Sequence, residues 1–218
     1  MHPVPFWGGR GAELRTQAQS DRRAAVWETD DQIEQHVQLM RRQVERSLAD
    51  PSTRMLAAAI VSGNFDQGID PRTGANVPVV PYHGRFYRGA KDWASAKQLC
   101  EMRDFMCEVN AIWNFVVMNI RYTGDQHGED TYQTLRATLE AGAGDCDDMT
   151  IAFAALLKAV GFEEVIARII SLDGRAWAHV YPLVLIPKRG WTALDATEKG
   201  KLPGWEFKGA RAQRDFAL

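Results

Sequence analysis

The segment from Asp147 to Val160 constrains the fold of this chain more than any other, because it is apolar on almost every face. Its large side chains are Met149, Ile151, Phe153, Leu156, Leu157 and Val160, with alanines between them. A helix without a polar face is normally buried at the centre of a domain. Gly161 follows it as a helix C-cap. We therefore expect the rest of the chain to pack around this helix.

The surrounding pattern predicts helices before the apolar helix and strands after it. Apolar residues from Ile33 to Leu48 recur at spacings of three and four, which is typical of one helical stripe, and Asp50-Pro51 begins a second helix. The strands are rich in β-branched residues. Predicted helices cover residues 30–48, 51–61, 92–120 and 135–140, and predicted strands cover residues 165–172, 176–186 and 191–195. This order indicates an α+β fold.

The remaining segments show no sustained period. Residues 1–29 are an expected arm, and residues 198–218 are an expected polar tail with Trp205, Phe207 and Phe216 as candidate anchors. Residues 62–91 are rich in Gly and Pro, so we expect either a functional or partner-binding loop or a connector packed on the surface. The predicted organisation is an N-terminal arm over residues 1–91, a catalytic domain over residues 92–200 and a C-terminal tail over residues 201–218.

Composition excludes several classes of protein. The chain has 26 basic and 28 acidic residues, a balance that argues against a protein dominated by phosphate contacts to nucleic acid. Its three cysteines form no CxxC motif, so we expect no disulfide framework, no structural zinc and a reducing environment. The amino terminus has no signal-peptide pattern, and the apolar stretch from Val109 to Ile120 is too short to span a membrane. We expect no cofactor, metal or membrane partner.

Cys146 stands at the start of the apolar helix, where unpaired N–H groups and the helix dipole favour a thiolate. The Ala-Gly-Ala-Gly turn before it permits a sharp bend and a close approach of substrate to the backbone. The flanking Asp145, Asp147 and Asp148 act in the opposite direction, because negative charge raises the pKa of a thiol. A protonated imidazole is therefore needed to hold the thiolate.

His179 and Asp195 can complete a triad with Cys146, provided that the hairpin between them has the right register. With a three-residue loop at positions 187–189, Asp195 lies opposite Tyr181 and on the same face as His179. A two-residue loop at Lys188-Arg189 would place it on the other face. In the first case Asp195 orients the imidazole and stabilises its charged form. The triad also requires His179 and Cys146 to project to the same side of the sheet.

Each of these residues also has a structural interpretation. A single cysteine is more often a small core residue, and a single strand histidine is more often structural. The combination with the Gly-rich turn and the buried helix favours the triad.

The motifs around these residues resemble the transglutaminase-like superfamily of papain-type cysteine enzymes. They are G-D-C-D-D before the apolar helix, A-H-V in a strand and W-x-x-L-D-A-T after it, within residues 92–200. The resemblance implies a papain-like fold in which a helical layer carries Cys146 and an antiparallel sheet carries His179 and Asp195. It implies Cys146 as nucleophile, His179 as base and Asp195 as the third member. Stand-alone members without a signal peptide are similar to ones in bacterial and bacteriophage genomes.

The resemblance also suggests where an oxyanion helper lies, in the loop before the Gly-rich turn. Gln133 is our candidate oxyanion donor, with Tyr122 and Gln126 as alternatives, and each can equally be a surface residue.

Other candidate residues have a structural interpretation that we prefer. Cys100 and Cys107 are seven residues apart on one predicted helix, which favours core packing over metal binding. His127, in the acidic loop from Asp125 to Asp130, is better explained by solvation than by a divalent ion. Residues 83–88 hold three cationic or titratable side chains and two aromatic side chains for docking: His83, Arg85, Arg88, Phe86 and Tyr87. Arg41, Arg42 and Arg46 fit a solvated helix face.

We expect a cysteine-dependent amide hydrolase, a peptidase or amidase that acts on a peptide or protein through a thioester. A protein cross-linking acyltransferase is one alternative. The other is a bacteriophage virion component, associated with tail or capsid, whose partners bind residues 1–91 and whose domain has local or lost activity. We expect a cytoplasmic location in a bacterium or phage-infected host, or a place in the virion.

Overall fold

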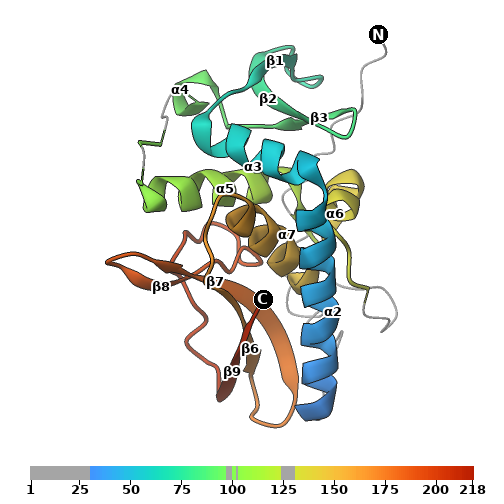
Figure 1. Cartoon of the computed structure of the whole chain (residues 1–218), viewed down its shortest axis with the longest axis vertical. Helices are drawn as coiled ribbons and strands as arrows, with labels where there is room; N and C mark the ends of the chain where they lie inside the picture. Colours follow the sequence, from blue (N-terminus) through green and yellow to red (C-terminus); the bar gives the residue numbers. More distant parts are fainter. Residues whose placement is uncertain (1–29, 97–99, 102, 124–130) are drawn as a thin grey trace.

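The computed structural model describes residues 30–96, 100–101, 103–123 and 131–218. The predicted arm at residues 1–29 lies outside them. Helices precede the main sheet in the chain, as Figure 1 shows, and the α+β prediction is confirmed. The helices are α2 (Asp30–Ala49), α3 (Pro51–Ser62), α4 (Trp93–Ala96), α5 (Phe105–Asn119), α6 (Leu135–Ala141) and α7 (Cys146–Ala159).

The main sheet has four antiparallel strands in the order β8-β7-β6-β9. The strands are β6 (Val165–Ser171), β7 (Trp177–Ile186), β8 (Gly190–Ala193) and β9 (Ala212–Ala217). A short parallel pair, β4 (Arg121–Tyr122) and β5 (Ala143–Gly144), leads the chain into α7. The start of α7 is therefore held by backbone pairing rather than by a free loop.

Helix α7 is the centre of the molecule, as its apolar sequence predicts. It lies between the main sheet and helices α2, α3 and α5 (Figure 1). Phe153 is fully buried and stacks on Trp113 of α5 with ring centroids 5.6 Å apart. Ile33 and Leu56, from α2 and α3, belong to the same core as Phe153. The N-terminal helices thus share one hydrophobic core with the residues that carry the family motifs.

The prediction of an irregular loop over residues 62–91 is wrong. The segment forms a three-stranded antiparallel sheet of β1 (Asp66–Ile69), β2 (Asn76–Tyr82) and β3 (Arg85–Arg88). Its turns use left-handed residues at Gly74, His83 and Gly84. Gly74 and Gly84, which mark a loop in the sequence, are here turn residues, whereas Pro78 and Pro81 lie within the central strand β2.

The predicted long helix over residues 92–120 is also wrong, and so is the expectation for its cysteines. Helix α4 ends at Ala96 and α5 begins only at Phe105, after the N-cap Asp104. Cys100 lies before α5 and forms a disulfide with Cys107, with the Cα atoms 5.4 Å apart. Cysteines seven positions apart can pair here because the chain bends between them instead of continuing as a helix.

The predicted polar tail contains a strand. Residues 212–217 form β9, which pairs with β6 and completes the main sheet. Phe216 packs against the main core, and Phe207 packs against a smaller cluster on the other face of the sheet. Trp205 stacks under the ammonium group of Lys201, 4.9 Å from the ring centre. Two of the three expected anchors therefore contact apolar clusters.

Candidate active site

Cys146 is the first residue of α7. Asp145 is the N-cap, and its side chain accepts a hydrogen bond from the backbone N–H of Asp148 at 3.0 Å. Gly142 ends helix α6 in the left-handed conformation, with φ of 65°, and so turns the chain toward β5. All three cysteines are described, and Cys146 is the free one. The one free thiol therefore lies at a helix N-terminus.

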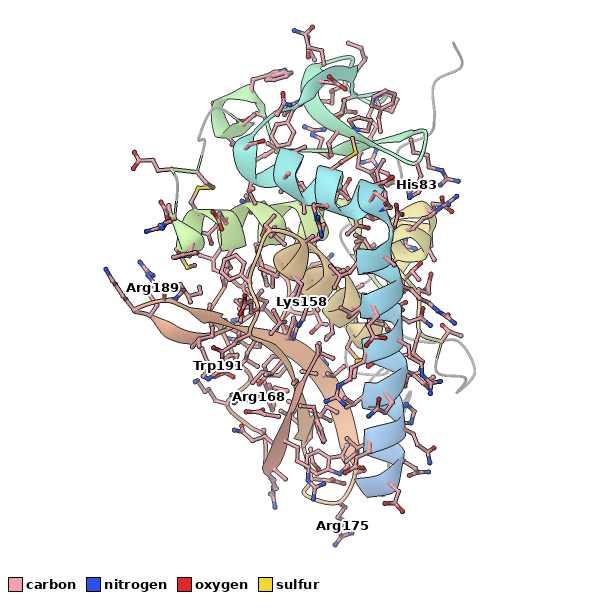
Figure 2. All side chains as sticks on the ribbon, viewed as in Figure 1. His83, Lys158, Arg168, Arg175, Arg189 and Trp191 are labelled. Carbon is pink, nitrogen blue, oxygen red and sulfur yellow. A yellow bond between two sulfur atoms is a disulfide. The ribbon has the colours of Figure 1, made fainter. Side chains whose placement is uncertain are left out.

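The β7–β8 hairpin has the register that brings His179 and Asp195 together. Ile186 pairs with Gly190, so the loop contains three residues, and Arg189 lies at its projecting tip (Figure 2). The backbone N–H of Leu194 continues the ladder by donating to Pro182 O at 2.9 Å. The prediction of the three-residue loop is confirmed.

His179 Nε2 and Asp195 Oδ2 form a hydrogen-bonded pair 3.0 Å apart. The Asp195 side chain is 1% exposed and that of His179 is 17% exposed. Thr197 donates its hydroxyl to Asp195 Oδ1 at 2.7 Å and its backbone N–H at 3.2 Å. Burial raises the pKa of Asp195, but the bonds to His179 and Thr197 outweigh burial, so its net pKa is below the usual value. Asp195 is thus a buried carboxylate held by two neighbours.

The position of the His179 ring is set by its contacts with Asp195 and Tyr181. Val180 belongs to the main core with α7, whereas Tyr181 belongs to the cluster on the opposite face of the sheet. The His179 ring lies beside Tyr181, with ring centroids 5.6 Å apart. Within the described residues, no hydrogen bond joins the His179 ring to the Cys146 sulfur. The expectation that both side chains project to the same side of the sheet stays a prediction.

The Cys146 sulfur instead meets the sheet at the edge of β7. In an antiparallel strand, the backbone N–H and C=O of residues two positions apart face the same neighbouring strand. The carbonyl of Pro182 faces β8, where it accepts the N–H of Leu194. The N–H of Val180, two residues earlier, therefore also faces the β8 side of β7. Strand β8 ends at Ala193, and beyond it the Val180 N–H stabilises the thiolate of Cys146. The thiol therefore lies next to the peptide group that joins His179 to Val180.

The surroundings of Cys146 favour the neutral thiol. Burial raises the pKa of Cys146 well above its ordinary value, and the charges of Asp147, Asp145 and Asp195 raise it further. Only the Val180 N–H acts in the opposite direction among the causes named here. The lowering expected from the helix dipole alone is overcome by burial and by the carboxylates.

Gln133 does not point at the sulfur. Its backbone N–H donates to Asp148 Oδ1 at 2.8 Å, and its side-chain amide donates to Oδ2 at 2.6 Å. Tyr122 lies in β4, where it pairs with Gly144. Gln126 and His127 lie outside the described residues. Gln133 therefore supports the first turn of α7 through Asp148, and its role as an oxyanion donor stays a prediction.

The residues singled out around position 83 make contacts within the fold. His83 Nε2 bonds Asp50, the N-cap of α3, at 2.5 Å. Arg85 donates to the carbonyl of Glu140 at 2.9 Å. Arg88 bonds Asp70 at 3.0 Å. The contacts of His83 and Arg85 join the small sheet to helices α3 and α6, whereas the Arg88–Asp70 pair lies within the small-sheet segment.

The aromatic pair in that segment is divided between surface and core. Phe86 is 62% exposed and Tyr87 is 8% exposed. On helix α2, Arg41 donates to the carbonyl of Ala217 in β9 at 2.7 Å, and Arg46 bonds Gln43 at 3.5 Å. Arg41 therefore links the N-terminal helix to the C-terminal strand.

No group of three or more His, Cys, Asp or Glu side chains in the described residues is arranged to hold a metal ion. No helix in the same part of the chain is long and apolar enough to cross a membrane.

Comparison with known families gives one match. The model of the transglutaminase-like superfamily matches residues 94–196. This segment belongs to the transglutaminase-like superfamily. The matched residues of this transglutaminase-like domain include Cys146, His179 and Asp195. Membership supports a function of the cysteine-hydrolase or transglutaminase kind.

The solved structures similar to this chain include two chains of LapG from Legionella pneumophila. The EGTA-treated form is 16% identical, with a TM-score of 0.27 and coverage of 84% of this chain and 68% of that chain. The second LapG chain has the same identity and TM-score and is covered over 70% of its length. At this TM-score the likeness carries no argument about the site. No curated protein matches the chain.

Thr197 and the Val180 N–H are the parts of the site that the sequence did not predict. The threonine of the D-A-T motif is visible in the sequence, but its contact with Asp195 depends on how the chain turns after β8. A backbone donor has no signature in the sequence, because every residue except proline carries one.

Proposed function

We propose that the protein is a cysteine-dependent amide hydrolase with Cys146 as nucleophile, His179 as general base and Asp195 as the residue that orients the base. The observation that carries the proposal is the 3.0 Å bond between His179 Nε2 and the buried Asp195. In this bond the Asp195 carboxylate is the acceptor, so the neutral imidazole of His179 carries its proton on Nε2. Nδ1 is then the basic nitrogen, the arrangement that a proton-accepting imidazole needs.

The proposed hydrolysis starts from the neutral thiol of Cys146. As the sulfur attacks the carbonyl carbon of an amide, its proton passes to His179 Nδ1, and the carbonyl oxygen becomes an oxyanion. His179 then gives the proton to the leaving amine, and a thioester remains on Cys146. Water, deprotonated by the same nitrogen, attacks the thioester and releases the carboxylic acid and the thiol.

Two features support this route. The transglutaminase-like domain includes all three residues within its matched range. The sulfur lies beside the peptide group that joins His179, the proposed base, to Val180. The N–H of Cys146, at the first position of α7, is a donor available to the oxyanion.

Alkylation of the free thiol tests the proposal directly. With the Cys100–Cys107 disulfide intact, iodoacetamide can modify Cys146 alone. We expect His179→Ala to slow alkylation near neutral pH at least about tenfold, because the base is lost. The matched control is His83→Ala, which removes a histidine bonded to Asp50 at the N-cap of α3. Equal rates for His179→Ala and the native protein, both folded, would refute the role of His179.

Hydrolysis and amine transfer differ in what resolves the thioester. With an amide substrate and an excess of a primary amine, hydrolysis gives the free acid, and transfer gives a new amide. Release of acid only supports the hydrolase, and predominant new amide supports the cross-linking alternative. The assembly role of residues 1–91 stays a prediction, to be tested by co-purification with a large particle.

The disulfide bears on the compartment. Disulfides persist mainly in oxidising environments and are rare in cytosolic proteins. The Cys100–Cys107 bond therefore supports an oxidising compartment over the cytoplasmic location that the cysteine count suggested.

A further inference from the structure

The carboxylate of Asp195 divides its two oxygens between two partners. Oδ2 bonds His179 Nε2 at 3.0 Å. Oδ1 accepts the hydroxyl of Thr197 at 2.7 Å and the backbone N–H of Thr197 at 3.2 Å. The side chain is buried, so water does not compete freely for either oxygen. The two hydrogen bonds from Thr197 therefore hold the orientation of the Asp195 carboxylate.

The Thr197 hydroxyl also determines whether His179 Nε2 faces hydrogen-bond donors or acceptors. Its hydroxyl has one proton, and that proton points to Asp195 Oδ1 in the 2.7 Å bond. The hydroxyl oxygen is 3.5 Å from His179 Nε2, so toward the ring it can act only as an acceptor. Both groups that face Nε2 are then acceptors. An imidazole nitrogen that faces two acceptors is favoured as N–H, which leaves Nδ1 as the basic nitrogen.

The carboxylate would otherwise have no fixed orientation. A bond between a carboxylate and a backbone N–H two residues later is a common local turn and tolerates several rotamers. Of the hydrogen bonds that Asp195 forms with His179 and Thr197, the one with the Thr197 hydroxyl is the shortest. Thr197 lies one residue beyond the segment that matches the family, at the point where the chain leaves the sheet.

We propose that Thr197 is a positioning residue that, through Asp195, holds His179 as the Nε2–H tautomer and so keeps Nδ1 free to accept the thiol proton. The catalytic part of this inference rests on the proposed function. The structural part, the control of the His179 tautomer by Thr197, does not.

The experiment compares Thr197→Val, which removes the hydroxyl and keeps the shape, with Thr197→Ser, which keeps the hydroxyl. The matched control is Thr192→Val, a half-buried β8 threonine. The ¹⁵N shifts of the His179 ring, measured by NMR on the full chain, report the tautomer. The pH profile of Cys146 alkylation reports the base.

We expect the native protein, Thr197→Ser and Thr192→Val to keep the Nε2–H tautomer. Thr197→Val should give a mixture of tautomers and slow alkylation about tenfold, since a hydrogen bond to a charged group is lost. If circular dichroism shows that Thr197→Val is unfolded, Thr197→Ala is measured in its place.

An unchanged tautomer in a folded variant without the hydroxyl would overturn the inference, as would an equal effect of Thr192→Val. The two proposals fail in different ways. If alkylation does not depend on His179 but the tautomer still depends on Thr197, the proposed function is wrong and the positioning role stands. If alkylation depends on His179 and Thr197→Val changes neither measurement, the positioning role is wrong and the proposed function stands.

Discussion

Replacement of Asp195 by asparagine should invert the proton arrangement of the site while keeping its shape. Thr197 presents two donors to Oδ1, at 2.7 and 3.2 Å, so the asparagine carbonyl oxygen must occupy that position. The asparagine NH₂ then faces His179 Nε2, which is 3.0 Å from Oδ2 in the native protein. Two donors cannot face each other, so the ring proton must move to Nδ1. His179 can then no longer accept the thiol proton.

The expected loss of amide hydrolysis is on the order of 10⁴-fold, the size seen where an enzyme triad is forced into the wrong tautomer. Alkylation of Cys146 should fall to the rate of the His179→Ala variant. The matched control is Asp173→Asn, a loop carboxylate that accepts the backbone N–H of Arg175 at 2.8 Å. Asparagine at position 195 with the native tautomer and near-native rates would refute the reasoning.

The same substitution should change the dependence of stability on pH. The pKa of Asp195 is lower in the folded protein than in the unfolded chain, so its ionised form stabilises the fold at neutral pH. That stabilisation is present above the ordinary carboxyl pKa and disappears as the pH falls through the lowered value. We expect Asp195→Asn to lower the free energy of unfolding by about 1–3 kcal/mol at neutral pH. Urea unfolding should show the difference shrinking below about pH 4.

Three further changes test the packing of the fold. Phe153→Ala removes a fully buried ring and should cost about 3–5 kcal/mol, which lowers the Tm in a thermal melt by roughly 10 °C. Gly144→Ala places a Cβ 2.7 Å from the Asp148 Cβ, so it should cost about 1–3 kcal/mol in chemical denaturation and slow alkylation of the neighbouring thiol. Cys107→Ser removes a link between residues seven positions apart and should cost about 2–3 kcal/mol, measured by urea unfolding.

Each of these changes has its own control. Phe86→Ala, at a 62% exposed position, should leave the Tm nearly unchanged, and an equal loss would contradict the account of the core. Ala141→Ser, at an exposed position of α6, should not affect the thiol. A reducing agent should destabilise the native protein but not Cys107→Ser. If it destabilises both alike, the disulfide is not the cause.

Much of the fold follows from local pattern. Helices α2, α3 and α7 and strands β6 and β7 lie close to their predicted bounds, because a repeated apolar face is present in each segment before it packs. The small sheet at residues 66–88 was missed, since its strands are short and its turn residues dominate the composition. The sequence did not predict the disulfide because one continuous helix was expected over residues 92–120. The chain instead leaves the helical conformation between α4 and α5, which lets Cys100 reach Cys107.

The sequence by itself determined the buried helix and the thiol at its start, and it limited the hairpin between His179 and Asp195 to two registers. These depend on spacing along one or two adjacent segments, which the order of residues fixes. Only the tertiary structure decided that burial and carboxylates keep Cys146 neutral, that the His179 ring lies beside Tyr181, and that Thr197 holds Asp195. Solvent exclusion and side-chain direction arise when elements distant in the chain pack together, so the order of residues does not state them.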